Sequence, residues 1–232
     1  MVESVLPYAF VLRKGTIADE ALDESAPPSR GAGTYADLGE GGERPARVEA
    51  LERFLDVVPE AAAVIATTGK CGRELFTLAD RAQHLYQVGS MGGASAMGLG
   101  LALNTDRPVV VLDGDGAALM KLGNLATIGA QAPYRLVHII LDNGVYDSTG
   151  GQATVSPLVD FARVALACGY RSGSLCDGLG GLERALEKAF AARGPHLVHM
   201  RIRPGSLAKL GRPTIKPFEV ARRLRAFLAA PG

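Results

Sequence analysis

The stretch from Pro108 to Gly151 constrains the fold more than any other part of the chain. It begins with an apolar run that ends in Gly114-Asp115-Gly116, continues through small residues, and repeats the pattern with an apolar run that ends in Asp142-Asn143-Gly144. This pattern predicts two parallel strands joined by a helix, with a polar loop at the same end of each strand. An open α/β sheet binds its ligand at that edge.

The two loops carry groups that suit a metal-bound diphosphate. Gly114 and Gly116 let the backbone bend sharply, and the amides that open the next helix, from Ala117, face an anion with the positive end of the helix dipole. Asp115 and Asn143 offer a carboxylate oxygen and an amide oxygen, which suit Mg²⁺ when phosphate oxygens and water complete its shell. A backbone carbonyl just past Asn143 is a third candidate ligand. Gly-Asp-Gly alone also makes ordinary turns, so the prediction depends on the pair of loops.

The spacing of these groups resembles the thiamine-diphosphate (ThDP) motif of the ThDP-dependent decarboxylases and synthases. Asn143 follows Gly116 after 26 residues, and this chain has Gly144 where the family has a second asparagine. The segments Asp147–Gln152 and Thr154–Ser156 are similar to those of the phosphonopyruvate decarboxylases, which is a narrower match. The resemblance implies that Mg²⁺ is held by Asp115, Asn143 and the carbonyl of Val145. It also implies cofactor contacts from Gly114, Asp115, Gly116, Ala117, Asn143, Val145 and Tyr146.

Another loop follows the buried strand predicted at residues 62–67. It runs into a helix through Thr67–Phe76, and its Gly69-Lys70 pair suggests a nucleotide-binding P-loop. That motif does not fit, because Cys71 stands where a P-loop has Ser or Thr.

The same loop is similar to a Thr-Thr-Gly segment, followed by Arg-Glu-Leu-Phe, that lies beside the cofactor in related decarboxylases. The resemblance implies cofactor contacts from Thr68 and Gly69. Two cations of this segment are candidates for binding the anionic part of a substrate, with a solvated surface position as the alternative. The candidate substrate residues are Lys70, Arg73, Ser148 and Thr149.

Residues 84–104 hold a further glycine-rich loop. A short predicted strand runs into Gly89-Ser90-Met91-Gly92-Gly93, and a helix of small residues follows. A tight turn with Met91 as core filler is the ordinary interpretation. The alternative comes from the family: Gly-x-Met-Gly resembles the loop in which the residue matching Met91 separates the two rings of ThDP. It implies that Ser90, Met91 and Gly92 bind the cofactor.

Strands and helices alternate along the rest of the chain. Apolar residues at helical spacing predict helices at residues 48–58, 159–167, 178–193 and 218–228, and a last strand lies at residues 196–202. The alternation predicts an α/β fold, a doubly wound parallel sheet of about six strands with helices on both faces. This is the ThDP-binding fold that the resemblance implies. A nicotinamide-linked dehydrogenase is disfavoured, since the third glycine of the dinucleotide fingerprint is missing.

The amino-terminal part has a different composition. Residues 1–15 resemble the segment that closes the pyrimidine-binding domain of single-chain phosphonopyruvate decarboxylases. Residues 19–47 are rich in Gly, Pro, Ala and acids, which predicts a linker that is ordered only on a partner. We therefore expect an extension and linker at residues 1–46 and the ThDP-binding domain at residues 47–232. The pyrimidine-binding half is expected from another polypeptide.

Composition narrows the remaining possibilities. The chain has 232 residues, 47% of them hydrophobic, and a formal net charge of +1, which gives no general reason to expect nucleic acid or an anionic membrane. It has no apolar run of membrane-spanning length and no signal-peptide pattern, so we expect a cytoplasmic protein. The three cysteines, 71, 168 and 176, are expected to be buried thiols, and the four histidines, 84, 138, 196 and 199, to be structural.

The resemblance implies a function for the chain. A carboxy-lyase of this kind converts 3-phosphonopyruvate to phosphonoacetaldehyde and CO₂ in phosphonate biosynthesis, with ThDP and Mg²⁺. The family's activating glutamate lies on the pyrimidine-binding domain, so we expect no certain catalytic residue in this chain and no activity without an α subunit. An assembly of two α and two β subunits or larger is expected.

Two alternatives remain open. The β subunit of sulfopyruvate decarboxylase has a similar loop, although Asp147 and Gly151 favour the phosphonate enzyme. The other alternative is a non-catalytic module for diphosphate binding or assembly.

Overall fold

The structure, a computed structural model, describes residues 11–21 and 31–230. It divides into two compact units, residues 1–30 and 31–232. In the first unit, residues 11–21 contain neither helix nor strand, and their side chains are exposed. The segment that resembles the end of a pyrimidine-binding domain falls largely within residues 1–10, outside the described residues.

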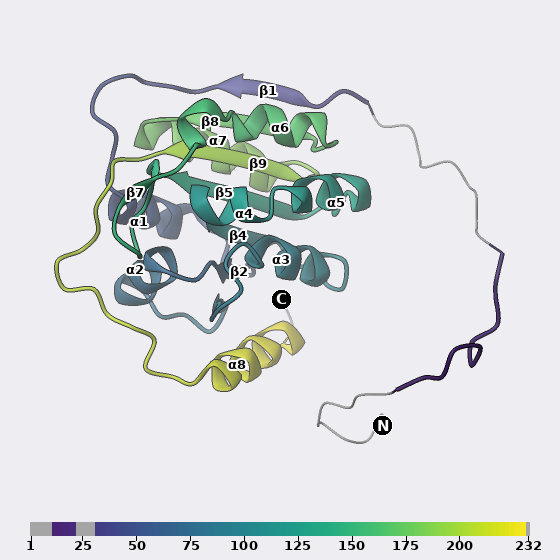
Figure 1. Cartoon of the computed structure of the whole chain (residues 1–232). Coiled ribbons are helices and arrows are strands. Elements are labelled where there is room, and N and C mark those ends of the chain that lie inside the picture. Colours follow the sequence, from purple (N-terminus) through teal and green to yellow (C-terminus); the bar gives the residue numbers. More distant parts are fainter. Residues whose placement is uncertain (1–10, 22–30, 231–232) are drawn as a thin grey trace. The chain divides into compact units, whose positions relative to one another are not determined.

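Seven parallel strands form the main sheet of the second unit, in the order β1-β8-β9-β5-β4-β2-β3 (Figure 1). This confirms the predicted doubly wound parallel sheet, with one strand more than the six expected. The strands are β1 (Thr34–Asp37), β2 (Ala63–Ala66), β3 (His84–Tyr86), β4 (Val109–Gly114), β5 (Leu136–Asp142), β8 (Ser172–Cys176) and β9 (His196–Arg201). A separate antiparallel hairpin, β6 (Val145–Tyr146) and β7 (Gln152–Ala153), was not predicted.

The additional strand, β1, comes from the stretch that was assigned to the linker. That assignment was wrong at residues 34–37, which pair with β8 along the edge of the sheet. Backbone bonds extend the pairing at both ends, from Thr34 to Arg171 at 3.0 Å and from Leu38 to Leu175 at 2.8 Å. Composition measures how much apolar surface a segment can bury, so it misses an edge strand held by its backbone. The division at residue 46 between the linker and the ThDP-binding domain stays a prediction.

Helices cover both faces of the sheet. One face carries α1 (Arg47–Val57), α2 (Lys70–Leu78), α7 (Leu179–Ala191) and α8 (Pro217–Ala229). The other carries α3 (Ala94–Ala102), α4 (Asp115–Met120), α5 (Gly123–Gln131) and α6 (Phe161–Ala167), which follows the 3₁₀ turn η1 (Ser156–Leu158). The single helix expected after Gly116 is therefore two, α4 and α5.

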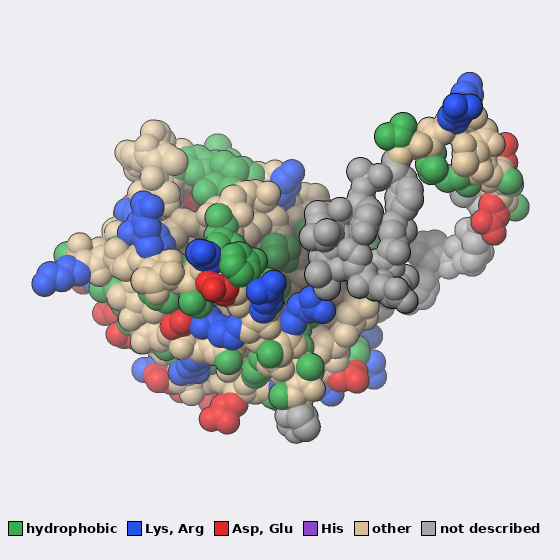
Figure 2. Space-filling view, turned by 90° about the horizontal axis from the view of Figure 1, so that it is seen from below, with side chains coloured by type: hydrophobic (Ala, Val, Ile, Leu, Met, Phe, Trp, Pro, Cys, Tyr) green, Lys and Arg blue, Asp and Glu red, His purple; other side chains and the backbone are tan. Residues whose placement is uncertain are grey.

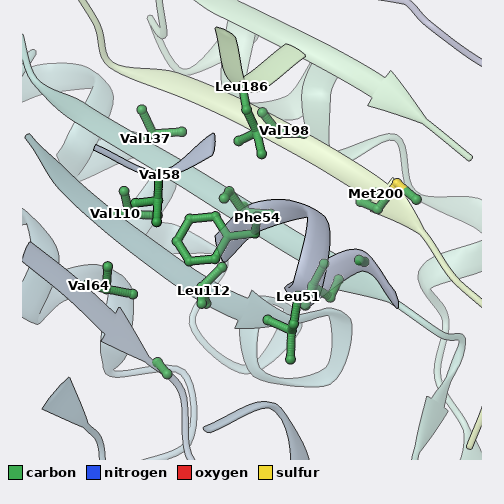
Figure 3. Packing of buried hydrophobic residues seen from close by; sticks show 14 of the residues in the cluster. Leu51, Phe54, Val58, Val64, Val110, Leu112, Val137, Leu186, Val198 and Met200 are labelled. Carbon is green, nitrogen blue, oxygen red and sulfur yellow. The ribbon is translucent and has the colours of Figure 1, made fainter. Parts of the chain in front are cut away.

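The core lies on both sides of the central strands. On β5, Val137 and Ile139 belong to one buried cluster and Leu136 and Ile140 to the other. A strand buried on both faces reads as a continuous apolar run, which is why this segment was recognisable in the sequence. The ring of Phe54 on α1 lies among the side chains that β4 contributes to the first cluster (Figure 3). Burial of such a side chain stabilises the fold by about 1.5–3 kcal/mol.

On the opposite face, α3 lies very close to β4. A Cβ atom placed on Gly98 would be 2.2 Å from Cγ2 of Val111, a separation far below any non-bonded contact between carbon atoms. The small residues of this helix therefore serve helix-to-sheet packing, which holds the loop before α3 against the end of β4.

The prediction of buried cysteine thiols is confirmed with one exception. Cys71 and Cys176 are buried free thiols, whereas Cys168 is only half-buried because it lies just past the end of α6. All four histidines are buried, and the described residues contain no group of three or more His, Cys, Asp or Glu arranged to hold a metal. None of the described helices has the length and apolar character to traverse a membrane. Figure 2 shows acidic, basic and hydrophobic side chains intermingled on one face.

Candidate functional site

A cavity of about 340 Å³ lies at the carboxyl ends of β2, β4 and β5. It brings together most of the residues singled out in the sequence. The predicted residues that line it are Thr68, Lys70, Met91, Gly114, Asp115, Gly116, Ala117, Asn143, Val145, Tyr146, Ser148 and Thr149. Those that do not are Gly69, Arg73, Ser90 and Gly92. Residues that the sequence reasoning missed complete the lining: Arg47, Thr67, Cys71, Met120, Leu141, Asp147 and Gln152.

The two polar loops lie side by side, as predicted. β4 and β5 pair in parallel with Gly114 opposite Leu141, so that both loops leave the sheet at the same edge. Asp115 and Asn143 are 2% and 7% exposed. Both side chains carry oxygen atoms and Val145 also lines the cavity, and oxygen ligands suit Mg²⁺ better than a softer metal.

The electrostatics of Asp115 favour a cation. Burial raises the pKa of its carboxyl group, and the nearby charge of Asp142 adds to the effect. The hydroxyl of Thr154 donates a hydrogen bond of 2.6 Å to the same carboxylate and offsets part of the rise. A buried carboxylate whose charged form is disfavoured gains most from a positive ion beside it.

Two further observations fit a bound diphosphate cofactor. The hydroxyl of Thr67, a residue 4% exposed on the cavity wall, has no hydrogen-bond partner among the described residues. Gly116 leaves room for the ring of Tyr146, since a Cβ there would lie 2.5 Å from Cε1 of that ring. The cavity thus offers an unused hydroxyl, backbone amides and oxygen-bearing side chains along its walls.

Asp142, which precedes Asn143, has a different environment. Burial raises the pKa of its carboxyl group, but hydrogen bonds from His199 at 2.8 Å and Ser156 at 2.6 Å outweigh burial, so the net pKa lies below the usual value. These bonds hold the carboxylate of Asp142 in its charged form and in a fixed position at the base of the loop. Sequence reasoning missed this role of His199, because the bond joins residues 57 positions apart on neighbouring strands.

A group of charged residues forms another wall. Arg47 contacts Asp147 at 2.9 Å and the fully buried Glu74 at 3.3 Å, and Lys70 lies 3.4 Å from Asp147. The sequence did contain an indication that Arg47 has a specific role. A cation at the first position of a helix is disfavoured by the helix dipole, so its presence at the start of α1 requires another reason.

Arg73 is placed away from the cavity. Its guanidinium donates to the carbonyls of Gly211 at 2.8 Å and Leu210 at 2.9 Å, which ties α2 to the carboxyl-terminal segment. Its proposed contact with a substrate therefore has no support in the geometry.

The glycine-rich loop before α3 contributes Met91 to the cavity. Gly92 has a φ of +84°, and a Cβ on it would lie 2.6 Å from the carbonyl oxygen of Ala117. The loop is therefore pressed against α4, and Met91 lines the cavity, whereas Gly92 is buried against α4 and Ser90 is exposed. Gly69, with a φ of +101°, turns the chain into α2 beside Ser148.

Comparisons with known proteins agree with this arrangement. Residues 68–200 match the thiamine pyrophosphate enzyme family, C-terminal TPP binding domain. The phosphonopyruvate decarboxylase of Streptomyces hygroscopicus is 59% identical over 228 residues, which cover 97% of this chain and 57% of that protein. This chain thus spans little more than half the length of that relative.

Two further relatives differ in length and similarity. Sulfopyruvate decarboxylase subunit beta of Methanothermobacter thermautotrophicus is 43% identical over 160 residues, covering 69% of this chain and 83% of that subunit. Among solved structures, the thiamine diphosphate-dependent 4-hydroxybenzoylformate decarboxylase of Rhodococcus jostii RHA1 superposes with a TM-score of 0.62 at 21% identity, covering 80% of this chain and 37% of that one. This last likeness concerns the fold alone.

Proposed function

Because the chain belongs to the thiamine pyrophosphate enzyme family and contains its C-terminal TPP binding domain, we propose that it holds magnesium-bound ThDP in a 2-oxo acid decarboxylase. The observation that carries this proposal is that Asp115 and Asn143, which directly follow the ends of the neighbouring strands β4 and β5, line one cavity. These side chains and the carbonyl of Val145 would hold Mg²⁺. The family supports ThDP itself, and the donor set supports the metal.

When bound, ThDP supplies an electron sink for the electron pair left by departing CO₂. The chain's own part is to bind and orient. Thr68 and the amides at Gly116 and Ala117 would contact the diphosphate, Met91 would separate the two rings, and Tyr146 packs on Gly116 at the cavity wall. Gly69, Ser90 and Gly92 would act through the shape of their loops.

The proposed substrate is 3-phosphonopyruvate, which would yield phosphonoacetaldehyde and CO₂. The 59% identity with a phosphonopyruvate decarboxylase supports this choice. Lys70, Ser148 and Thr149 line the cavity and are the proposed substrate contacts. Sulfopyruvate is the second candidate, favoured by the 83% coverage of a subunit of sulfopyruvate decarboxylase, a chain of similar extent.

We further propose that a separate α subunit with the pyrimidine-binding domain completes the site. The residues that line the cavity include no glutamate to activate the aminopyrimidine. A relative is named as a beta subunit, and Met97, Leu103 and Met120 are large apolar side chains that this chain leaves 42–52% exposed. The chain alone is therefore expected to be inactive.

The test is reconstitution with the α subunit. Calorimetry should detect binding of ThDP with Mg²⁺ to the wild-type complex, and Asp115→Ala should abolish it while the chain still folds, as circular dichroism would show. Asp56→Ala, at an exposed position on α1, is the matched control. Turnover of sulfopyruvate alone would contradict the substrate choice, and a complex that binds no ThDP would instead support a non-catalytic module.

A further inference from the structure

A chain of buried polar groups connects Asp115 to His199. Thr154 Oγ1 lies 2.6 Å from Asp115 Oδ2 and 2.9 Å from Ser156 Oγ, which itself donates to Asp142 Oδ1 at 2.6 Å. Nε2 of His199 lies 2.8 Å from the other oxygen of Asp142. All five side chains are buried, with exposed fractions between 0% and 8%. A buried polar network whose members all have hydrogen-bond partners holds their side chains in fixed positions.

The hydrogen positions in this chain follow from the donors available. The hydroxyl hydrogen of Ser156 points to Asp142, because an ionised carboxylate can only accept. The backbone N–H of Ser156 approaches Thr154 Oγ1 at 3.3 Å and occupies one of its lone pairs. The ionised carboxylate of Asp115 can likewise only accept, so the single hydroxyl hydrogen of Thr154 is directed to it, and Ser156 bonds to Thr154 through its backbone N–H.

Thr154 also contacts the other ligand-bearing loop. Its backbone N–H donates to the carbonyl of Gly144 at 2.8 Å, and Gly144 lies between Asn143 and Val145. One residue thus bonds to both loops of the proposed metal site, through its side chain to the end of β4 and through its backbone to the end of β5. These two bonds fix the distance and the angle between Asp115 on one loop and Asn143 and Val145 on the other.

We propose that Thr154 is a positioning residue for Mg²⁺, with Ser156, Asp142 and His199 holding it from behind. The inference rests on the proposed function, in which Asp115, Asn143 and Val145 supply the metal ligands. Mg²⁺ demands nearly ideal octahedral geometry, whereas Ca²⁺ accepts irregular shells with longer bonds. A residue that sets the ligand geometry therefore matters more for Mg²⁺ than for Ca²⁺. Loss of an outer-shell partner typically lowers metal affinity by about 10–100-fold.

The experiment compares Thr154→Val, which keeps the shape but removes the hydroxyl, with Thr154→Ser, which restores it. Mg²⁺ and Ca²⁺ are titrated separately, with ThDP present, onto the full chain in complex with its α subunit. Thr154→Val should lose about tenfold or more in Mg²⁺ affinity and clearly less in Ca²⁺ affinity, and Thr154→Ser should recover most of the loss. Thr127→Val, at an exposed threonine of α5, should change neither affinity.

The outcomes separate the two proposals. Unchanged Mg²⁺ affinity in Thr154→Val, equal losses for both ions, or no recovery in Thr154→Ser would overturn the positioning role alone. A wild-type complex that binds neither ThDP nor Mg²⁺ would overturn the proposed function and the positioning role with it. If Thr154→Val fails to fold, Ser156→Ala and His199→Gln take its place, and the same shift in the ratio of Mg²⁺ to Ca²⁺ affinity is expected at smaller size.

Discussion

The guanidinium of Arg47 donates a hydrogen bond of 2.9 Å to the carboxylate of Asp147, which lies 100 residues further along the chain. The same carboxylate accepts from the side-chain amide of Asn143 at 3.4 Å, so it helps to decide which way that amide faces. Arg47 therefore connects the start of α1 to the loop that carries a proposed metal ligand. Its other partner, Glu74, is fully buried and also accepts from the backbone of Leu207.

Arg47→Met should destabilise the fold strongly. It would leave the buried Glu74 without its cation, and breaking a buried pair on one side costs about 3–5 kcal/mol. The double variant with Glu74→Gln should recover part of that loss, because the remaining partner is then neutral. Arg53→Met is the matched control, since its pair with Glu183 is 36% exposed on both sides and is expected to contribute less than about 1 kcal/mol. Urea unfolding measures each value, and equal losses at Arg47 and Arg53 would contradict the assignment.

Two glycines of one helix, α3, should respond in opposite ways to alanine. At Gly98 the new methyl group would meet Val111 at 2.2 Å, so Gly98→Ala is expected to destabilise by roughly 1–3 kcal/mol. At Gly100 nothing lies within 4 Å, and Gly100→Ala should stabilise by up to about 1 kcal/mol through helix propensity. Thermal unfolding of the two variants tests the packing directly, and a stabilising Gly98→Ala would show that α3 and β4 are further apart than described.

The sequence predicted those parts of the structure that depend on residues close together in the chain. Strands β4 and β5 are buried on both faces and therefore appear as continuous apolar runs, and the loops after them carry Asp115 and Asn143 at fixed offsets. The site could be predicted to that extent. The supports of the site could not, because they depend on contacts between distant segments. Thr154 reaches Asp115 only when the β6–β7 hairpin brings it back beside Gly144, and nothing near Arg47 indicates a partner at Asp147.

The amino-terminal edge of the sheet is the clearest case of a missed element. β1 is half-exposed and short, so its composition resembles that of a linker, but Tyr35 donates to Asp160 at 3.0 Å and Glu40 pairs with Arg184 at 3.1 Å. Such contacts become visible only when β8 is known to lie next to it.

Truncation tests whether residues 31–46 act as a linker or as part of the sheet. A chain that begins at residue 31 retains β1 and should melt within about 2 °C of the full chain. A chain that begins at residue 47 loses β1 and uncovers the edge of β8, so it should melt several degrees lower and aggregate, since an uncovered strand edge pairs readily with other chains. Calorimetric melting and light scattering measure both effects. Identical behaviour of the two truncated chains would mean that β1 adds nothing to the stability of the sheet.

His84 should make the stability of the protein depend on pH in mildly acidic solution. Burial lowers its pKa from 6.5 to about 4, and the nearby positive charges of Arg81 and Arg223 act in the same direction, whereas the bond to the carbonyl of Ala79 and the charge of Asp80 oppose them. The unfolded chain therefore takes up a proton near pH 6.5 that the folded chain refuses until about pH 4. Stability is fully retained above the unfolded pKa and is lost as the pH falls between these two values, by about 3 kcal/mol in total. Urea unfolding of the wild type and His84→Gln at about pH 7.5 and about pH 4.5 isolates this contribution, because other titrating groups are common to both. The wild type should lose more stability on acidification than the variant, and parallel losses would show that His84 is protonated as easily in the folded chain as in the unfolded one.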